Sequence, residues 1–361
     1  MRMFPLFGVV LLMTVGGVFA QAQDQPLTPA LPDYPVMVRK AIEKSLPLIA
    51  KSATAFNARA KCVSCHNQSL PSMTFAMSRE RGFKIDEKAA KAQTTAVYET
   101  LAGAKELIKQ AQTEASAERI VDSILVDPAA TASYLGLGLA AEKVKRDELM
   151  EGVALYLAKK QTEEGYWPVL ESRPPQQSSD FTTTAMSIRV LQAYAPVSQS
   201  KAIGERVARA KNWLRTAVAK TNEDRVFRIL GLSAAGATKE EIRKAVDELL
   251  VTQLDDGGWA QTDRMTSDAY ATGQALLALN MGGGVLVTHP AFHRGYKYLL
   301  KTQKEDGSWL VEARTIPLQV FIHTDFPHGK NQFISLSATC WATMALSLTV
   351  EPKMGKTTAS R

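Results

Sequence analysis

Two cysteines and a histidine lie close together near the start of the chain, in the segment Cys62-Val63-Ser64-Cys65-His66. This Cys-x-x-Cys-His spacing is the attachment pattern of a c-type haem. Each thiol adds to one vinyl group of the porphyrin, and the two intervening residues span the distance between the vinyl groups. His66 is then held beneath the iron as its proximal ligand. The segment therefore predicts one covalently attached haem c, with Cys62 and Cys65 forming the two thioether bonds.

Two other chemistries use closely spaced cysteines, and the sequence favours neither of them. A structural zinc ion takes four ligands, usually from a second pair of Cys or His residues. The third cysteine of the chain, Cys340, has no such partner in the sequence. A redox dithiol of the thioredoxin type belongs to a βαβ unit, whereas the sequence around Cys62 has a helical pattern. Haem attachment is therefore the preferred interpretation.

The first 20 residues have the pattern of a secretory signal peptide. Residues 1–3 carry a positive charge, 4–18 form an apolar run, and 18–20 match a small-residue cleavage site. No later stretch approaches the roughly 20 apolar residues of a membrane-spanning helix. We therefore expect a periplasmic or secreted protein without a membrane span in its mature chain, the alternative being a signal segment retained as an anchor. Residues 21–35 are then a linker.

The composition restricts the classes of partner. An apolar fraction of 45 % in 361 residues is typical of a globular chain with a sizeable core. The formal net charge of +7 is spread along the chain and suits an acidic redox partner or a membrane surface. Basic runs interleaved with aromatic residues do not occur, so the sequence does not favour nucleic-acid binding.

Three segments share the spacing Gln-x-x-x-Gly-x-Trp, and each follows an amphipathic segment. They are Gln161–Trp167, Gln253–Trp259 and Gln303–Trp309. Glycine takes the left-handed conformation that the end of a helix requires. The tryptophan ring is expected to pack beside that helix end, and the glutamine amide to bond free backbone groups there. Each segment therefore predicts the structured turn of an αα hairpin that leads into a helix of small residues.

Three further hairpins complete the pattern. Their predicted helices are 36–54 with 70–81, 88–112 with 128–141, and 202–219 with 225–235. Six αα hairpins over residues 36–350 can close into a ring, with the small-residue helices inside and the amphipathic helices outside. The sequence thus predicts an all-α fold, a single (α/α)6 toroid with the haem site at the first hairpin (about 57–75). Residues 351–361 are predicted to be a disordered tail.

The Gln-x-x-x-Gly-x-Trp pattern resembles the repeat of squalene–hopene cyclases and of the prenyltransferase β-subunit, which share the (α/α)6 toroid. The similarity covers roughly residues 36–350 and is strongest over 150–350, where the three motifs lie. Together with Cys62–His66, the pattern resembles a group of exported bacterial proteins that join cyclase-like repeats to a c-type haem site. This resemblance implies a toroid whose central cavity often holds an active site.

The resemblance to the cyclases does not extend to their acid motif, Asp-x-Asp-Asp-Thr-Ala. The matching positions are 180–185, where Asp180 is present but Thr182 and Thr183 replace the two later carboxylates. A strong general acid needs a second carboxylate to tune it, so we do not expect squalene–hopene cyclase activity. Asp180 and Asp268, which each follow a serine at the start of a predicted helix, are instead expected to cap their helices.

A polar and aromatic loop, 321–332, precedes the sixth inner helix. Closure of the ring brings the sixth hairpin beside the first, so we expect this loop to lie next to the haem. His328 is the candidate distal ligand or haem-pocket residue, which would make His66 and His328 the metal-binding pair. Met265 is a second candidate, and Met73 follows His66 too closely to reach the opposite face of the iron. The alternative is that His328 only bonds within its own loop.

Three functions fit these observations. The preferred hypothesis is electron transfer, either as a carrier with a redox partner protein or as part of a periplasmic oxidoreductase. A haem-containing enzyme that acts on a small apolar substrate in the toroid cavity is the first alternative. A binding or sensory scaffold with a structural haem is the second. Two protein ligands to the iron favour electron transfer, whereas an open sixth position favours ligand binding or catalysis.

Overall fold

The computed structural model describes residues 33–60, 63–315 and 321–353. The predicted signal peptide (1–20), most of the linker, Cys62 and the end of the predicted tail lie outside the described residues. From Tyr34 onward, the described residues form one compact unit. Apart from the gaps, this unit contains the region that the repeats predict to form a ring.

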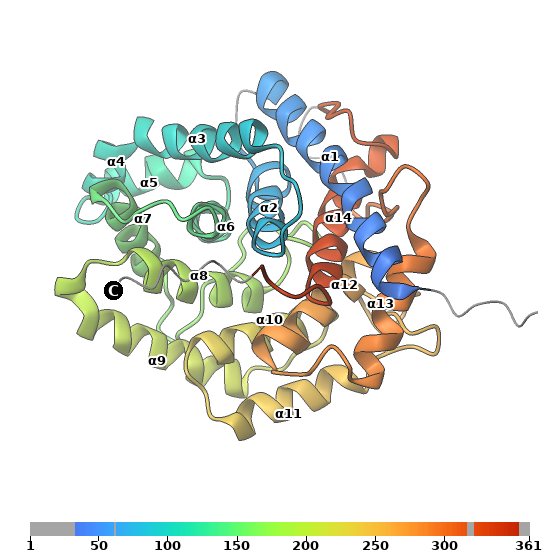
Figure 1. The fold of residues 1–361 in the computed structure, drawn as a ribbon. Helices are drawn as coiled ribbons and strands as arrows, with labels where there is room; N and C mark the ends of the chain where they lie inside the picture. Colours follow the sequence, from blue (N-terminus) through green and yellow to red (C-terminus); the bar gives the residue numbers. More distant parts are fainter. Residues whose placement is uncertain (1–32, 61–62, 316–320, 354–361) are drawn as a thin grey trace, which may run out of the picture. The chain divides into compact units, whose positions relative to one another are not determined.

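Among the described residues, six pairs of helices form the ring of this unit, and Figure 1 shows one helix of each pair outside and the other inside. The outer helices are α1 (Tyr34–Ala60), α3 (Glu87–Gly103), α7 (Glu148–Lys159), α9 (Ser200–Thr216), α11 (Lys239–Leu250) and α13 (Pro290–Thr302). The inner helices are α2 (Leu70–Glu80), α6 (Pro128–Ala141), α8 (Asp180–Tyr194), α10 (Asn222–Ala234), α12 (Ala269–Leu277) and α14 (Gln332–Ser347). The described part of the chain has two isolated β-bridges but no β-strand. The predicted (α/α)6 toroid is therefore confirmed.

The inner helices differ from the outer ones in burial and in side-chain size. Every residue of α12 is buried, whereas α11 buries only Ala245, Val246 and Leu249. A helix that is apolar on all sides belongs in a core, and an amphipathic one belongs at its surface. Small residues also let the inner helices approach closely, because a Cβ added to Gly273 would lie 2.6 Å from the backbone of Trp341.

The three Gln-x-x-x-Gly-x-Trp segments form structured turns, but their glycines do not end the outer helices as predicted. In the second segment, Gly257 has a φ of +90°, in the left-handed region, and lies in a turn beyond Leu250, the last residue of α11. The indole Nε1 of Trp259 donates to the carbonyl of Leu249 at 3.0 Å, and its backbone N–H donates to Thr272 Oγ1 at 2.9 Å. The same two contacts join Trp167 to Leu157 and Thr184, and Trp309 to Leu299 and Thr339. Each tryptophan therefore fixes an outer helix to its own inner helix.

The glutamine of each segment links one hairpin to the next, and we call this contact the staple. Gln253 Nε2 donates to the carbonyl of Gly257 in its own turn and to the carbonyl of Ala291 in α13, both at 2.8 Å. Gln303 Nε2 makes the equivalent bond to the carbonyl of Ala41 in α1 at 2.9 Å. The third staple thus joins the sixth hairpin to the first and closes the ring.

The second hairpin contains two short helices between its outer and inner helices. They are α4 (Lys105–Gln110) and α5 (Ala115–Ile124). The sequence indicates helix up to residue 112 but gives no sign of α5, which buries only Ala117 and Val121. Lys160 pairs with Glu118 of α5 at 2.7 Å, so a contact distant in sequence helps to hold this helix. Among the described helices, none alone is long and apolar enough to cross a membrane, and α5 with α6, bent by 69°, meets that test only as a pair.

Candidate functional site

The described part of the Cys-x-x-Cys-His segment, residues 63–66, lies in the first hairpin before α2. Cys65 begins a short π-helix, η1 (Cys65–Ser69), which leads directly into α2. Gln68 Oε1 accepts from the backbone N–H of Ser64 at 2.6 Å, and its Nε2 donates to Asn57 Oδ1 at 2.8 Å. The turn is therefore held by its own side chains and by the end of α1.

The imidazole of His66 packs between two aromatic rings. The ring centroid of Phe56 lies 5.8 Å away and that of Phe333, at the start of α14, lies 4.9 Å away. Nδ1 lies 2.5 Å from Asn67 Oδ1, while Asn67 Nδ2 donates to Ser52 Oγ at 3.2 Å. Because this bond turns the amide oxygen toward the imidazole, the proton belongs on Nδ1 and Nε2 keeps its lone pair.

Electrostatics also favour a neutral imidazole at this position. The pKa of His66 is lowered to about 4, mainly by burial and partly by the nearby charge of Arg173, whereas the bond to Asn67 opposes the shift. An iron-binding histidine must be neutral, and its second ring nitrogen usually donates to an oxygen. The chemistry of His66 and Asn67 therefore fits the proximal side of a c-type haem.

The loop at 321–332 lies beside the first hairpin, as the closure of the ring predicts. Arg59, at the end of α1, donates to Asp325 Oδ1 of this loop at 2.7 Å. His328 has a φ of +81°, and its Nε2 lies 2.7 Å from Ser308 Oγ. Ser308 belongs to the third Gln-x-x-x-Gly-x-Trp turn, so the side chain of His328 bonds a different segment. Binding to iron through Nε2 would require His328 to leave Ser308.

The two methionines considered as iron ligands and the third cysteine lie in different parts of the fold. Met73 packs partly buried against the core from α2, and Met265 lies in the loop before α12. Cys340 is fully buried in α14, where burial raises the pKa of its thiol to about 12. Within the described ranges, no group of three or more His, Cys, Asp or Glu residues could hold a metal ion.

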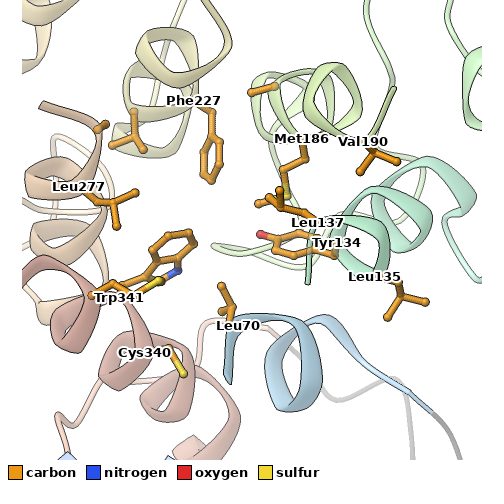
Figure 2. Close-up of a cluster of buried hydrophobic side chains, with 14 of the residues drawn as sticks. Leu70, Tyr134, Leu135, Leu137, Met186, Val190, Phe227, Leu277, Cys340 and Trp341 are labelled. Atoms are coloured by element: carbon orange, nitrogen blue, oxygen red, sulfur yellow. The ribbon is translucent and has the colours of Figure 1, made fainter. Parts of the chain in front are cut away.

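Side chains fill the centre of the ring. Figure 2 shows the inward-pointing residues, each at most 2 % exposed: Leu70, Tyr134, Met186, Phe227 and Trp341. A groove of about 1050 Å³ lies instead along α1, where Leu46, Lys51 and Arg59 form part of its lining together with Phe75 of α2. Arg59 places one end of this groove near the Cys-x-x-Cys-His turn.

A buried carboxylate on α10 was not among the residues that the sequence singled out. Glu223 is 4 % exposed, and its Oε1 accepts from Thr182 Oγ1 at 3.0 Å and from Tyr270 OH at 3.4 Å. Burial raises the pKa of Glu223 to about 8. The sequence shows only a polar run before a helix, which predicts a turn. Thr221 and Asp224 do form a capping box there, and this leaves Glu223 to face the ring.

Part of the chain is similar to known cyclases in sequence. Residues 224–349 match the family model of the squalene–hopene cyclase C-terminal domain. The squalene–hopene cyclase of Bradyrhizobium diazoefficiens is 35 % identical over 130 residues, which cover 30 % of this chain and 18 % of that protein. The probable squalene–hopene cyclase of Sinorhizobium fredii is 33 % identical over 130 residues, which cover 30 % of this chain and 19 % of that protein. The matches thus span about a fifth of the length of these relatives.

Solved structures extend the likeness to nearly the whole chain. The type II terpene cyclase MstE from Scytonema, without a ligand, aligns with a TM-score of 0.54 and 14 % identity, covering 89 % of this chain and 100 % of that one. This chain has the fold of a terpene-cyclase-like α/α toroid. At this level of identity, the likeness concerns the fold alone.

Of the two aspartates that were predicted to cap their helices, one does so and the other does not. Asp268 caps α12, since its Oδ1 accepts from the backbone N–H of Ala271 at 2.9 Å. The same prediction is wrong for Asp180, whose Oδ1 accepts from the backbone N–H of Val169 at 2.8 Å. Asp180 is the first helical residue rather than the N-cap, so its side chain turns back and holds the preceding loop of the toroid.

Proposed function

We propose that this chain is an exported c-type haem protein built on a terpene-cyclase-like toroid, and that it transfers electrons. It would act as a carrier or as part of a periplasmic oxidoreductase. The observation that carries the proposal is the pairing of His66 with Asn67 inside the Cys-x-x-Cys-His turn. This pairing supplies a neutral imidazole whose Nε2 lone pair is available for a metal.

Each residue of the turn would have a separate role. Cys62 and Cys65 would form the thioether bonds, and His66 would bind the iron through Nε2. A bound haem supplies an iron that takes up and releases one electron. Phe56 and Phe333 pack against the partly exposed imidazole, and an apolar shell of this kind is one determinant of the reduction potential.

The ligand on the distal side of the iron is a separate proposal. His328 is the candidate ligand, because its loop lies beside the first hairpin through the Arg59–Asp325 ion pair. Its present bond to Ser308 supports a second role, in which His328 only joins two loops of the sixth hairpin. The two roles predict different spectra for variants of His328 and Ser308.

The filled centre of the ring supports electron transfer over catalysis on a small apolar substrate. A substrate cavity normally offers several hundred Å³, whereas Phe227 and Trp341 meet near the axis with ring centroids 6.3 Å apart. A redox partner with an acidic surface would suit the net charge of +7. The apolar start of the sequence supports a periplasmic or secreted location.

The test is covalent haem attachment. Protein expressed with its signal peptide in cells that contain the c-type maturation machinery should keep its haem through acid–acetone extraction. Cys62→Ala and Cys65→Ala should each reduce the retained haem, and their combination should abolish it. Cys340→Ala is the matched control and should retain haem as the wild type does. Complete loss of haem from the wild-type protein in this extraction would overturn the proposed function.

A further inference from the structure

A narrow crevice of about 10 Å³ reaches the start of α10 from the surface of the toroid. Ser178 and Arg314 are exposed members of its lining, whereas Asn222, Glu223 and Gln274 are at most 4 % exposed. The crevice therefore connects solvent with buried polar side chains. It involves none of the residues assigned to the haem.

The buried residues of this crevice leave several polar atoms without a hydrogen-bond partner. They are Glu223 Oε2, Asn222 Oδ1, and Nε2 and Oε1 of Gln274. Buried polar groups in folded proteins are nearly always paired, with protein atoms or with ordered water. Four such atoms around one small space therefore point to a bound molecule that pairs with them.

The size and polarity of the space indicate that the bound molecule is water. A water molecule needs a cavity of roughly 10–15 Å³ and two to four polar partners. Such a water can accept a hydrogen bond from the O–H of a neutral Glu223 carboxyl and donate one to Asn222 Oδ1. The Gln274 amide is then its third partner. The same water can donate to an ionised Glu223 carboxylate and to Asn222 Oδ1 while it accepts from Gln274 Nε2, so both charge states of the carboxyl find partners in this space.

We propose that the crevice binds one water molecule among Glu223, Asn222 and Gln274, and that Glu223 and this water form a proton-binding site in the toroid. When the carboxyl ionises, its O–H bond breaks and the proton passes to the water. From there it leaves through the crevice to bulk solvent, so no other reactant is needed. This site goes beyond the proposed haem function and does not depend on it.

The surrounding charges are consistent with a carboxyl that holds its proton at neutral pH. Burial is the main reason that the pKa of Glu223 is raised to about 8, and the charge of Asp224 raises it further. The nearby amide of Gln274 and the hydroxyls of Thr182 and Tyr270 oppose this shift. Charged and titratable groups on the surrounding elements include Asp224 and Arg225 of α10, Asp268 and Tyr270 of α12, Asp180 and Arg189 of α8, and Arg314 of the crevice lining. On the outer side of α10, toward α9 and α11, Arg228 pairs with Glu248.

Infrared spectroscopy tests the site, because a protonated carboxyl has a C=O stretch separate from that of a carboxylate. In the wild-type protein, this band should disappear with a midpoint near pH 8, and it should be missing from Glu223→Gln. Asp268→Asn is the matched control, since asparagine also caps helices, and it should keep the band that titrates near pH 8. Thr182→Val removes one bond to the ionised form and should move the midpoint upward.

A crystal structure of the wild-type protein provides the second measurement. An ordered water within hydrogen-bond distance of Glu223 Oε2 is the expected result. The proposal is wrong if the crevice is dry, if the band is already lost at pH 6, or if Glu223→Gln retains it. An unchanged midpoint in Thr182→Val would also contradict the assignment of the band to Glu223.

Discussion

The hydrogen bond between His66 and Asn67 decides which ring nitrogen is available for a metal. Asn67 can accept from Nδ1 because its own amide N–H₂ is held by Ser52 of α1. Histidine ligands whose second nitrogen lacks such a partner bind metals more weakly, typically by about 10–100-fold. At this position the partner comes from the neighbouring residue, so a short local segment contains both the ligand and the group that orients it.

We therefore expect Asn67→Ala to weaken the bond between His66 and the iron without removing the covalent haem. Exogenous imidazole should displace His66 at concentrations about 10-fold lower than in the wild type, as measured by absorption titration of the ferric protein. Asn57→Ala is the control, because it removes a bond to Gln68 and leaves the imidazole contact intact. Equal imidazole titrations in wild type and Asn67→Ala would exclude this role.

At the residue scale, the raised pKa of Glu223 also leads to a prediction for the dependence of stability on pH. Its pKa is raised from 4.5 to about 8 in the folded protein. Between these values the folded state binds more protons than the unfolded state, so the free energy of unfolding falls as pH rises. Urea denaturation should show a larger loss of stability from pH 6 to pH 9 in the wild type than in Glu223→Gln. Identical losses in the two proteins would show that Glu223 is not protonated in the folded state.

Local sequence identified the Cys-x-x-Cys-His turn but could not identify Glu223. The spacing of two cysteines and a histidine is itself the signal, and its residues are neighbours in the chain. The environment of Glu223 is assembled from α8, α10 and α12, through Thr182 and Tyr270. Nothing in the residues beside Glu223 shows that it faces the ring, since a capping box of Thr221 and Asp224 explains the same polar run.

At the scale of elements, the sequence predicts the turns of the three motifs well, although it wrongly places their glycines at the helix ends. Glycine, tryptophan and glutamine each make the same contact in all three turns, so the repeat encodes its own geometry. Trp259 donates to the carbonyl of Leu249 at the end of α11, and Gln253 adds the staple to α13. No comparable local sequence pattern marks helix α5. Ion pairs from Lys160, which is distant in sequence, help to hold it.

We expect Gly257→Ala to destabilise the protein more than Gly236→Ala, although both glycines have a positive φ. A left-handed backbone costs a residue with a Cβ roughly 1–2 kcal/mol, and both variants incur this cost. At Gly257 the added Cβ would also lie 2.8 Å from the backbone oxygen of Arg294, whereas nothing lies within 4 Å at Gly236. Urea denaturation of the two variants measures the difference. Equal stabilities would mean that α13 can move away without loss.

At the scale of the whole molecule, contacts between the first and last hairpins complete the toroid. Gln303 bonds Ala41 across the closure, and the hydroxyls of Ser45 and Thr343 lie 2.8 Å apart in the core. The count of hairpins was enough to predict this closure, because a ring of six brings its ends together. It could not predict where individual side chains in the closing loops point. His328 therefore lies in the expected region but bonds Ser308.

The last prediction concerns the sixth ligand of the iron, which depends on this closure. If His328 leaves Ser308 to bind the haem, the wild-type protein should show a low-spin spectrum. His328→Ala should then convert that spectrum to high spin and shift the reduction potential. Ser308→Ala removes the competing bond of 2.7 Å, so this variant should remain low-spin. His323→Ala is the control from the same loop, since its side chain is 63 % exposed, and it should change the spectrum little.

The alternative role of His328, in which it only joins two loops, predicts a different set of results. If His328 only joins the two loops, His328→Ala and Ser308→Ala should lower the free energy of unfolding by similar amounts, about 1 kcal/mol for the loss of one hydrogen bond, and both should leave the spectrum unchanged. An unchanged low-spin spectrum would transfer the distal role to a methionine, with Met265→Ala as the next variant. A high-spin spectrum in the wild type would mean that the sixth position is open, which favours ligand binding over electron transfer.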